Sequence, residues 1–119
     1  MPSRNYSDLI AWQKAMDLTE AIYAASSAMP PNERFGLTSQ MRRAAVSVPA
    51  NIAEGEGRRT RGEFLNQLSV AHGSLRELET HVQLAVRLWF LNCDVGRQLL
   101  DQTAEVGRIL NGLARSLRQ

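Results

Sequence analysis

The longest periodic segment of the chain sets the strongest limit on its fold. Between Thr60 and Leu91, apolar residues recur every three or four positions, the spacing of one face of an α-helix. They are Phe64, Leu65, Leu68, Ala71, Leu75, Leu78, Val82, Ala85, Val86 and Trp89. The pattern predicts a helix over residues 61–91, with about 31 residues and a length of ~46 Å. A compact chain of 119 residues has a radius of gyration of only ~13.5 Å, so this rod requires an elongated bundle.

Three further segments carry helical spacing, over residues 8–28, 37–53 and 95–117. Pro30 and Pro31 end the first of them, because paired prolines cannot continue a helix. At 119 residues the chain has room for one domain, which we place at residues 1–119. We therefore predict an all-α, up-and-down four-helix bundle. The two apolar stripes of the first helix favour burial on two sides, as in a homo-oligomer.

The segment from Gly36 to Gly55 is expected to form one helix with an apolar and a polar face. Pro49 lies inside it and cannot donate a hydrogen bond to the carbonyl of Ala45, so we expect a kink there. Ser47 or Asn51 are candidates to satisfy that carbonyl. The alternative is a helix that ends one or two residues before the proline and restarts after it.

Short polar side chains mark the predicted starts of the helices, because their oxygens accept hydrogen bonds from first-turn amides. The candidates are Ser7 or Asp8 for the first helix, Thr38 or Ser39 for the second, and Thr60 with Glu63, spaced as a capping box, for the third. The Asn111–Gly112 pair is a hairpin signal in other contexts. Here its flanks have helical spacing, so we place it inside the fourth helix.

The net charge of +2 is unevenly distributed. Residues 1–33 carry −2, residues 34–61 carry +4, and residues 62–119 are neutral. The basic residues of the middle segment are all arginines: Arg34, Arg42, Arg43, Arg58, Arg59 and Arg61. Arginine is suited to planar partners such as phosphate or carboxylate. This cluster indicates either a nucleic-acid surface or a set of solvated or intersubunit ion pairs.

Three sequence blocks resemble a known family. They are residues 8–18 (DLIAWQKAMDL), 36–55 (GLTSQMRRAAVSVPANIAEG) and 73–80 (GSLRELET). In this order and spacing the chain resembles the four-helix-bundle proteins encoded in intervening sequences of large-subunit ribosomal RNA genes. The resemblance covers nearly the whole chain. It implies a helical bundle that assembles into a homopentamer, with nucleic-acid binding proposed for some relatives and no defined activity for most.

Catalytic and metal-binding patterns are absent from the sequence. His72 and His81 are nine positions apart on one predicted helix and point to opposite sides. No Glu-x-x-His pair of a di-iron bundle is present, and we expect Glu77 and His81 to form a surface pair. Cys93 is the only cysteine, so no internal disulfide forms. We expect no enzyme activity, no cofactor and no metal. No signal-like segment or long apolar run occurs, which favours the cytoplasm.

The sequence therefore favours a non-catalytic, oligomeric binding module. Its predicted site for RNA or DNA backbone consists of Arg42, Arg43, Arg58, Arg59 and Arg61. A partner protein is a further candidate ligand, and no membrane partner is expected. The alternative is a protein-binding or scaffolding homopentamer that binds no nucleic acid and uses its arginines for subunit contacts.

Overall fold

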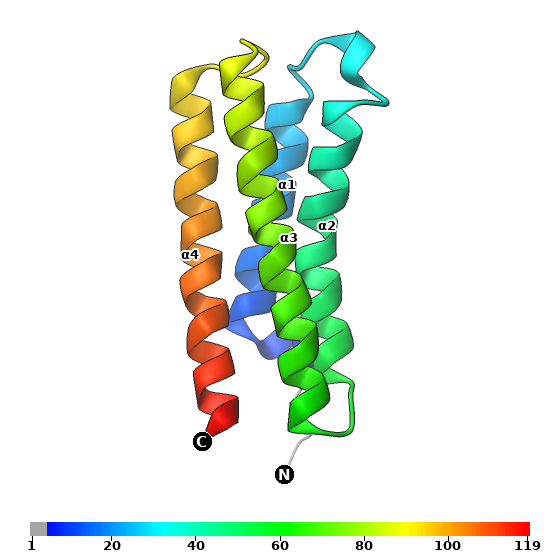
Figure 1. The fold of residues 1–119 in the computed structure, drawn as a ribbon, viewed down its shortest axis with the longest axis vertical. Helices are drawn as coiled ribbons and strands as arrows, with labels where there is room; N and C mark the ends of the chain where they lie inside the picture. Colours follow the sequence, from blue (N-terminus) through cyan, green and yellow to red (C-terminus); the bar gives the residue numbers. More distant parts are fainter. Residues whose placement is uncertain (1–4) are drawn as a thin grey trace.

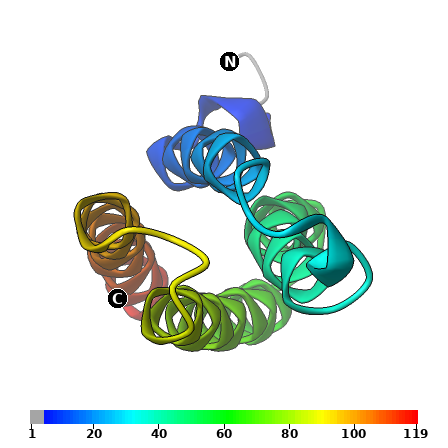
Figure 2. The same cartoon turned by 90° about the horizontal axis from the view of Figure 1, so that it is seen from above.

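Four long helices run side by side in the computed structural model, which describes residues 5–119 (Figure 1). They are α1 (Ile10–Ser26), α2 (Leu37–Glu56), α3 (Arg61–Arg87) and α4 (Cys93–Arg118), with the 3-10 helices η1 (Tyr6–Asp8) and η2 (Pro31–Glu33). Successive helices point in opposite directions. α1 and α3 each pack against α2 and α4, so the four helices surround one core when seen from above (Figure 2). The predicted all-α four-helix bundle is confirmed.

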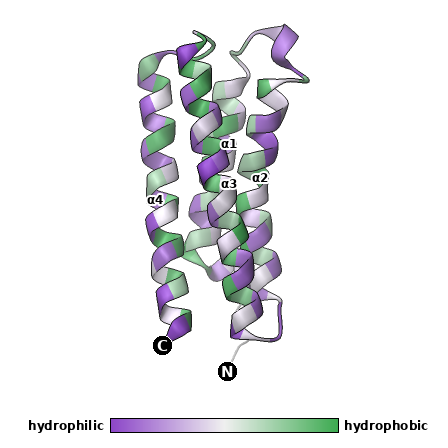
Figure 3. Ribbon diagram, in the orientation of Figure 1, coloured by the Kyte–Doolittle hydropathy of each residue, from purple (hydrophilic) through white to green (hydrophobic). Residues whose placement is uncertain are grey.

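Apolar side chains from all four helices fill this core. The largest fully buried ones are Leu18, Ile22, Met41, Val48, Ile52, Leu78, Val82, Val106 and Leu110. Hydrophobic and hydrophilic residues interchange along every helix, as expected for helices with one buried face (Figure 3). The molecule measures 49 × 22 × 22 Å, and its radius of gyration is 15.0 Å. It is thus more elongated than a compact chain of this length, whose radius of gyration is ~13.5 Å. Within residues 5–119, no helix combines the length and apolar character of a membrane span.

Pro49 lies inside α2, which continues through it from Leu37 to Glu56. The predicted continuous helix is confirmed and the alternative break is wrong, while the kink stays a prediction. The carbonyl of Ala45 accepts a hydrogen bond at 3.1 Å from the hydroxyl of Thr19 on α1, which also donates to Ala15 O. The expectation of Ser47 or Asn51 as donor is wrong. A side chain of a neighbouring helix therefore replaces the missing donor.

The end of α3 lies at Arg87 and not at residue 91 as its apolar spacing predicts. Trp89 has a φ of 64°, the left-handed conformation that follows many helix ends. The amides of Trp89 and Phe90 donate to Val86 O and Ala85 O at 3.1 and 2.9 Å and close the last turn. Trp89 is 91% exposed, so its assignment to the apolar face of the helix is wrong.

The residues that cap the helix starts agree with the sequence prediction only for α3. Thr60 caps α3 by accepting from the amide of Glu63 at 3.1 Å, as predicted, whereas the Glu63 carboxylate accepts from the Thr60 hydroxyl and not from its amide. Asn5 forms a capping box with Asp8 that begins η1, and α1 then starts without a side-chain cap. For α2, the Glu33 carboxylate accepts from the amide of Leu37 at 3.1 Å. The caps proposed for the first two helices are therefore wrong.

Glycines admit close helix contacts at two places. A Cβ atom at Gly96 would lie directly on Cγ2 of Val86, and one at Gly55 would lie 2.8 Å from Cβ of Gln67. Gly73, in contrast, has open space around it and admits no close helix contact. Its neighbour Ser74 instead shares a hydroxyl hydrogen bond of 2.9 Å with Ser47 of α2. The close contact of Gly96 with Val86 therefore lies at the end of α3 and α4 that carries their connection.

Candidate functional site

The five arginines of the predicted site lie at two levels of the bundle. Arg42 and Arg43 belong to the first half of α2, whereas Arg58 and Arg59 follow its end and Arg61 begins α3. The 15 residues from Arg43 to Arg58 correspond to ~22 Å along a helix. A single phosphate therefore cannot contact both levels, and the arginines form two separate groups.

Two of the five guanidinium groups are held by the ends of neighbouring helices. Nε of Arg42 donates to Oγ of Ser26 at 2.8 Å, and its Nη2 donates to the Tyr23 carbonyl at 3.3 Å. Nη1 of Arg61 donates to main-chain oxygens of Leu117 and Gln119 at 3.3 and 2.7 Å. These acceptors lie at the C-terminal ends of α1 and α4, where the helix dipole favours a cation. Both side chains therefore stabilise the bundle.

The other three arginines are more accessible. Arg58 forms an exposed ion pair with Glu54. The carboxylate of Glu54 also accepts a hydrogen bond from the side-chain amide of Gln67. Within residues 5–119, the exposed side chains of Arg43 and Arg59 form no ion pair or hydrogen bond. Within the described residues, Glu54 pairs with Arg58 and not with Arg43. Arg43 and Arg59 are consequently the members of the predicted set with unengaged charges.

A cavity of about 610 Å³ lies beside Arg43, between the end of α1, the connector and the first half of α2. We call it the α1–α2 pocket, and its lining residues are Tyr23, Arg34, Phe35, Thr38, Ser39, Arg42, Arg43, Val46 and Ser47. Three of these are arginines and none carries a carboxylate. The pocket is therefore a positively charged recess with hydroxyl and aromatic groups on its walls.

An arginine guanidinium lies over each of the two aromatic rings of the α1–α2 pocket. The guanidinium of Arg42 lies over the ring of Tyr23 at 4.5 Å from its centroid, and that of Arg34 lies 5.1 Å from the centroid of Phe35. Such cation–π contacts hold the guanidinium groups against the rings. Phe35 is nevertheless 86% exposed, so most of its ring surface is open to a ligand.

Sequence reasoning missed Tyr23 and Phe35 and left Arg34 out of the predicted site. Arg34 and Phe35 are adjacent in a connector bounded by Pro31 and Gly36, which is a local signal for an exposed aromatic residue beside a cation. The contribution of Tyr23 has no such signal. It comes from the other helix and reaches the pocket only through the packing of α1 against α2.

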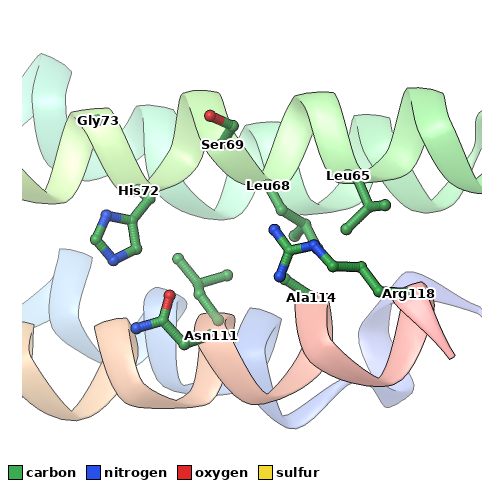
Figure 4. A pocket seen from close by; sticks show the side chains of 9 residues that line it. Leu65, Leu68, Ser69, His72, Gly73, Asn111, Ala114 and Arg118 are labelled. Carbon is green, nitrogen blue, oxygen red and sulfur yellow. The ribbon is translucent and has the colours of Figure 1, made fainter.

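A second polar surface follows α3 and α4. Two hollows of about 230 and 220 Å³ share His72 and Asn111 at their junction. Figure 4 shows these two side chains facing each other from opposite helices in the first hollow, with Arg118 at its other end. The second hollow contains Arg76, which is paired with Glu79 at 3.3 Å, and Arg108. The second hollow has both signs of charge on its walls, in contrast to the α1–α2 pocket.

The two histidines belong to α3, and the only cysteine begins α4. His81 is buried, with Nε2 at 3.9 Å from the Glu77 carboxylate, so the expected surface pair is wrong for the histidine. Nδ1 of His81 has no hydrogen-bond partner within residues 5–119. The free thiol of Cys93 is exposed. In the part of the chain that the structure describes, no three His, Cys, Asp or Glu residues gather as metal ligands.

Comparison with known proteins supports the sequence resemblance. A protein of unknown function from the S23 ribosomal protein family of Bacteroides thetaiotaomicron VPI-5482, solved at 1.70 Å resolution, has the same fold with a TM-score of 0.81. The two chains are 22% identical, and the match covers 88% of this chain and 98% of that one. No curated protein matches the sequence significantly. The family model of the 23S rRNA-intervening sequence protein matches residues 7–112. This chain therefore belongs to the 23S rRNA-intervening sequence protein family.

Proposed function

We propose that this protein is a non-catalytic, oligomeric module that binds RNA or DNA through the phosphate backbone. The observation that carries the proposal is the α1–α2 pocket, with three arginines and no carboxylate on its walls. Phosphate contacts dominate the affinity of most nucleic-acid complexes and require cations that are free to approach the strand. Arg43 meets that requirement, and Arg59 offers a second contact at the far end of α2.

The contacts of the guanidinium groups rank the predicted site residues. Arg43 and Arg59 are assigned as direct phosphate ligands because their charges are unengaged. Arg58 contributes less, since its exposed pair with Glu54 must open first. Arg42 and Arg61 supply positive potential but stay bound to the ends of α1 and α4.

Assembly into a ring multiplies these weak sites. Exposed apolar residues occur on two helices that lie diagonally across the bundle, with Ile10 and Met16 on α1 and Val70 and Leu84 on α3. Two different faces favour a head-to-tail contact, which closes into a ring when the rotation between subunits permits it. A homopentamer, the assembly implied by the family resemblance, would carry five copies of the pocket, whose contacts add through multivalency.

A salt titration tests the proposal. Binding of generic RNA and DNA strands is measured by fluorescence anisotropy for the parent and for the double variant Arg43→Gln/Arg59→Gln. The parent should lose affinity steeply as salt rises, and the variant should flatten the slope by about 2, one unit for each lost phosphate contact. The control variant Arg87→Gln/Arg115→Gln removes the same charge from exposed positions on α3 and α4 and should keep the slope of the parent.

Two outcomes would contradict this assignment. If the double variant binds as tightly as the parent at every salt concentration, these arginines are not the phosphate ligands. If the parent binds neither RNA nor DNA at low salt, the protein-binding or scaffolding function replaces nucleic-acid binding. The exposed Trp89 and Leu88 beside the α3–α4 connection are the surface that favours this alternative.

A further inference from the structure

We propose that the α1–α2 pocket receives one unpaired nucleotide of a single strand, whose base stacks on Phe35 while its phosphate is bound by Arg43. This inference rests on the proposed function and assigns the form of nucleic acid that the same site prefers. Four features of the site support it: the exposure of Phe35, the rigidity of its turn, the charge of the walls and the concave shape.

Phe35 presents an aromatic surface that the described chain leaves largely open. Its ring is 86% exposed, although it lies between two ordered elements and next to a large cavity. The guanidinium of Arg34 occupies one side of the ring at 5.1 Å from the centroid. Stacking of a base on an aromatic side chain is the main sequence-tolerant interaction of single-strand binding proteins, and arginine adds cation–π attraction to such stacks. A base on the remaining surface of Phe35 would complete a layer of arginine, phenylalanine and base.

The turn that carries Phe35 is held firmly by its neighbours. The amide of Gly36 donates to the carbonyl of Glu33 at 2.9 Å, and the amide of Leu37 donates to the Glu33 carboxylate at 3.1 Å. The carbonyl and the carboxylate of Glu33 therefore bind the two residues that follow Phe35 and close the turn around it. The backbone of such a turn loses little conformational freedom when a ligand binds, which favours affinity.

Charge in the pocket is arranged for one phosphate beside the aromatic surface. Arg42 is fixed by Ser26 and Tyr23 and adds positive potential without moving. Arg43, one position further along α2, is exposed and able to reach the phosphate. Arg43 also lines the neighbouring hollow of about 430 Å³ between α2 and α3, whose walls include the carboxylate of Glu77. Because that carboxylate repels phosphates, Arg43 is assigned the phosphate of the nucleotide in the pocket and the strand is not placed in this hollow.

The shape of the pocket favours an unpaired base over a duplex. Its volume of about 610 Å³ lies within the range of sites that enclose small molecules. In a duplex the base faces are stacked inside, and only backbone and groove edges are available to a protein. Phe35 can therefore stack only on a base that has left the helix or belongs to a single strand.

The test compares strands and duplexes on the intact protein. The probe is a fluorescently labelled RNA of about 12 nucleotides without self-complementarity, within the span of known single-strand sites, used alone and annealed to its complement. Phe35→Leu keeps an apolar side chain but removes the aromatic surface. It should weaken single-strand binding by roughly 5- to 150-fold, leave duplex binding unchanged and leave the salt slope unchanged. DNA strands of the same sequence should respond in the same way.

Trp89→Leu is the matched control, because it removes a similarly exposed aromatic ring outside the pocket, and it should bind like the parent. Arg43→Gln should flatten the salt dependence of binding, and this variant should still bind the single strand more tightly than the duplex. The pocket assignment is overturned if Phe35→Leu binds the single strand within twofold of the parent, if it weakens strand and duplex equally, or if it changes the mass of the oligomer. In each of these cases salt-dependent binding by the parent still supports the proposed function. A parent that binds neither strand nor duplex overturns both.

Discussion

Arg42 and Arg43 are neighbours in the chain, yet their guanidinium groups have different surroundings. Arg42 is bound to Ser26 and Tyr23 across the α1–α2 contact, whereas Arg43 points to solvent. A helix turns by 100° per residue, so adjacent side chains can belong to an interface and to an open surface. At the scale of single residues, the nearby carbonyls and carboxylates therefore decide whether an arginine holds the bundle together or is free to bind a ligand.

Substitution of these two arginines should separate stability from binding. Arg42→Gln removes hydrogen bonds from a charged donor to Ser26 and Tyr23 and should lower the free energy of unfolding by about 1–2 kcal/mol. Arg43→Gln should change it by no more than about 0.5 kcal/mol, as is usual for exposed positions. Urea unfolding followed by circular dichroism measures both. Equal stability of the two variants would contradict the structural role of Arg42.

Thr19 and Pro49 offer a second test at this scale. Thr19→Val leaves the Ala45 carbonyl without its donor and should destabilise the bundle by about 1–2 kcal/mol. In the Pro49→Ala background the amide of residue 49 can donate to that carbonyl, so the same change should cost clearly less. Urea unfolding of the four proteins in this double-mutant cycle measures the coupling. Additive effects would show that Thr19 does not compensate for the proline.

At the scale of helices, the sequence predicts that each helix exists more reliably than it predicts where the helix ends or which residue caps it. Apolar spacing identifies all four helices, and the path of α2 through Pro49 follows from its two continuous faces. The end of α3 was not predicted, because Trp89 continues the apolar period in the sequence but adopts a left-handed conformation in the structure. The predicted start of α2 at residue 37 is confirmed, but its cap was missed because it comes from Glu33, outside the helix.

The candidate site was predictable to a similar degree. Charge counting found the arginine-rich segment, but spacing along the chain could not tell which guanidinium groups are already bound. Arg61, for example, meets the end of α4, and a contact across 58 residues leaves no local pattern. Phe35 was missed because a lone aromatic residue in a connector has no periodic context.

Glycine substitutions test the helix contacts. Gly96→Ala would place a methyl group on Cγ2 of Val86 at the α3–α4 contact and should destabilise the protein by about 1–3 kcal/mol. Gly73→Ala meets open space within α3 and should stabilise it by up to about 1 kcal/mol through helix propensity. Thermal unfolding compares the two variants with the parent. Adding Val86→Ala should relieve most of the effect of Gly96→Ala, and a lack of relief would contradict the close contact.

At the scale of the whole molecule, the elongated shape leaves long helix sides available to other copies. The bundle is 49 Å long but only 22 Å wide. Val70 and Leu84 lie within about 40° of each other around α3 and are 52% and 43% exposed, and Glu77 lies between them on the same side. These two exposed apolar side chains are the residues of α3 that we propose for a contact with another copy. The diagonal position of α1 and α3 gives a subunit two such sides.

From the shape of the whole molecule we therefore predict that it assembles with other copies. Size-exclusion chromatography with light scattering should give a multiple of the 13.3 kDa chain mass, and we expect five copies. Leu84→Glu places a charge on the proposed contact of α3 and should reduce the mass to that of one chain without loss of helicity. Gln83→Glu adds the same charge at the adjacent exposed position, on a different side of the helix, and should leave the oligomer intact. A monomeric parent at micromolar concentration would contradict the assembly, whereas an oligomeric Leu84→Glu variant would place the contact on another face.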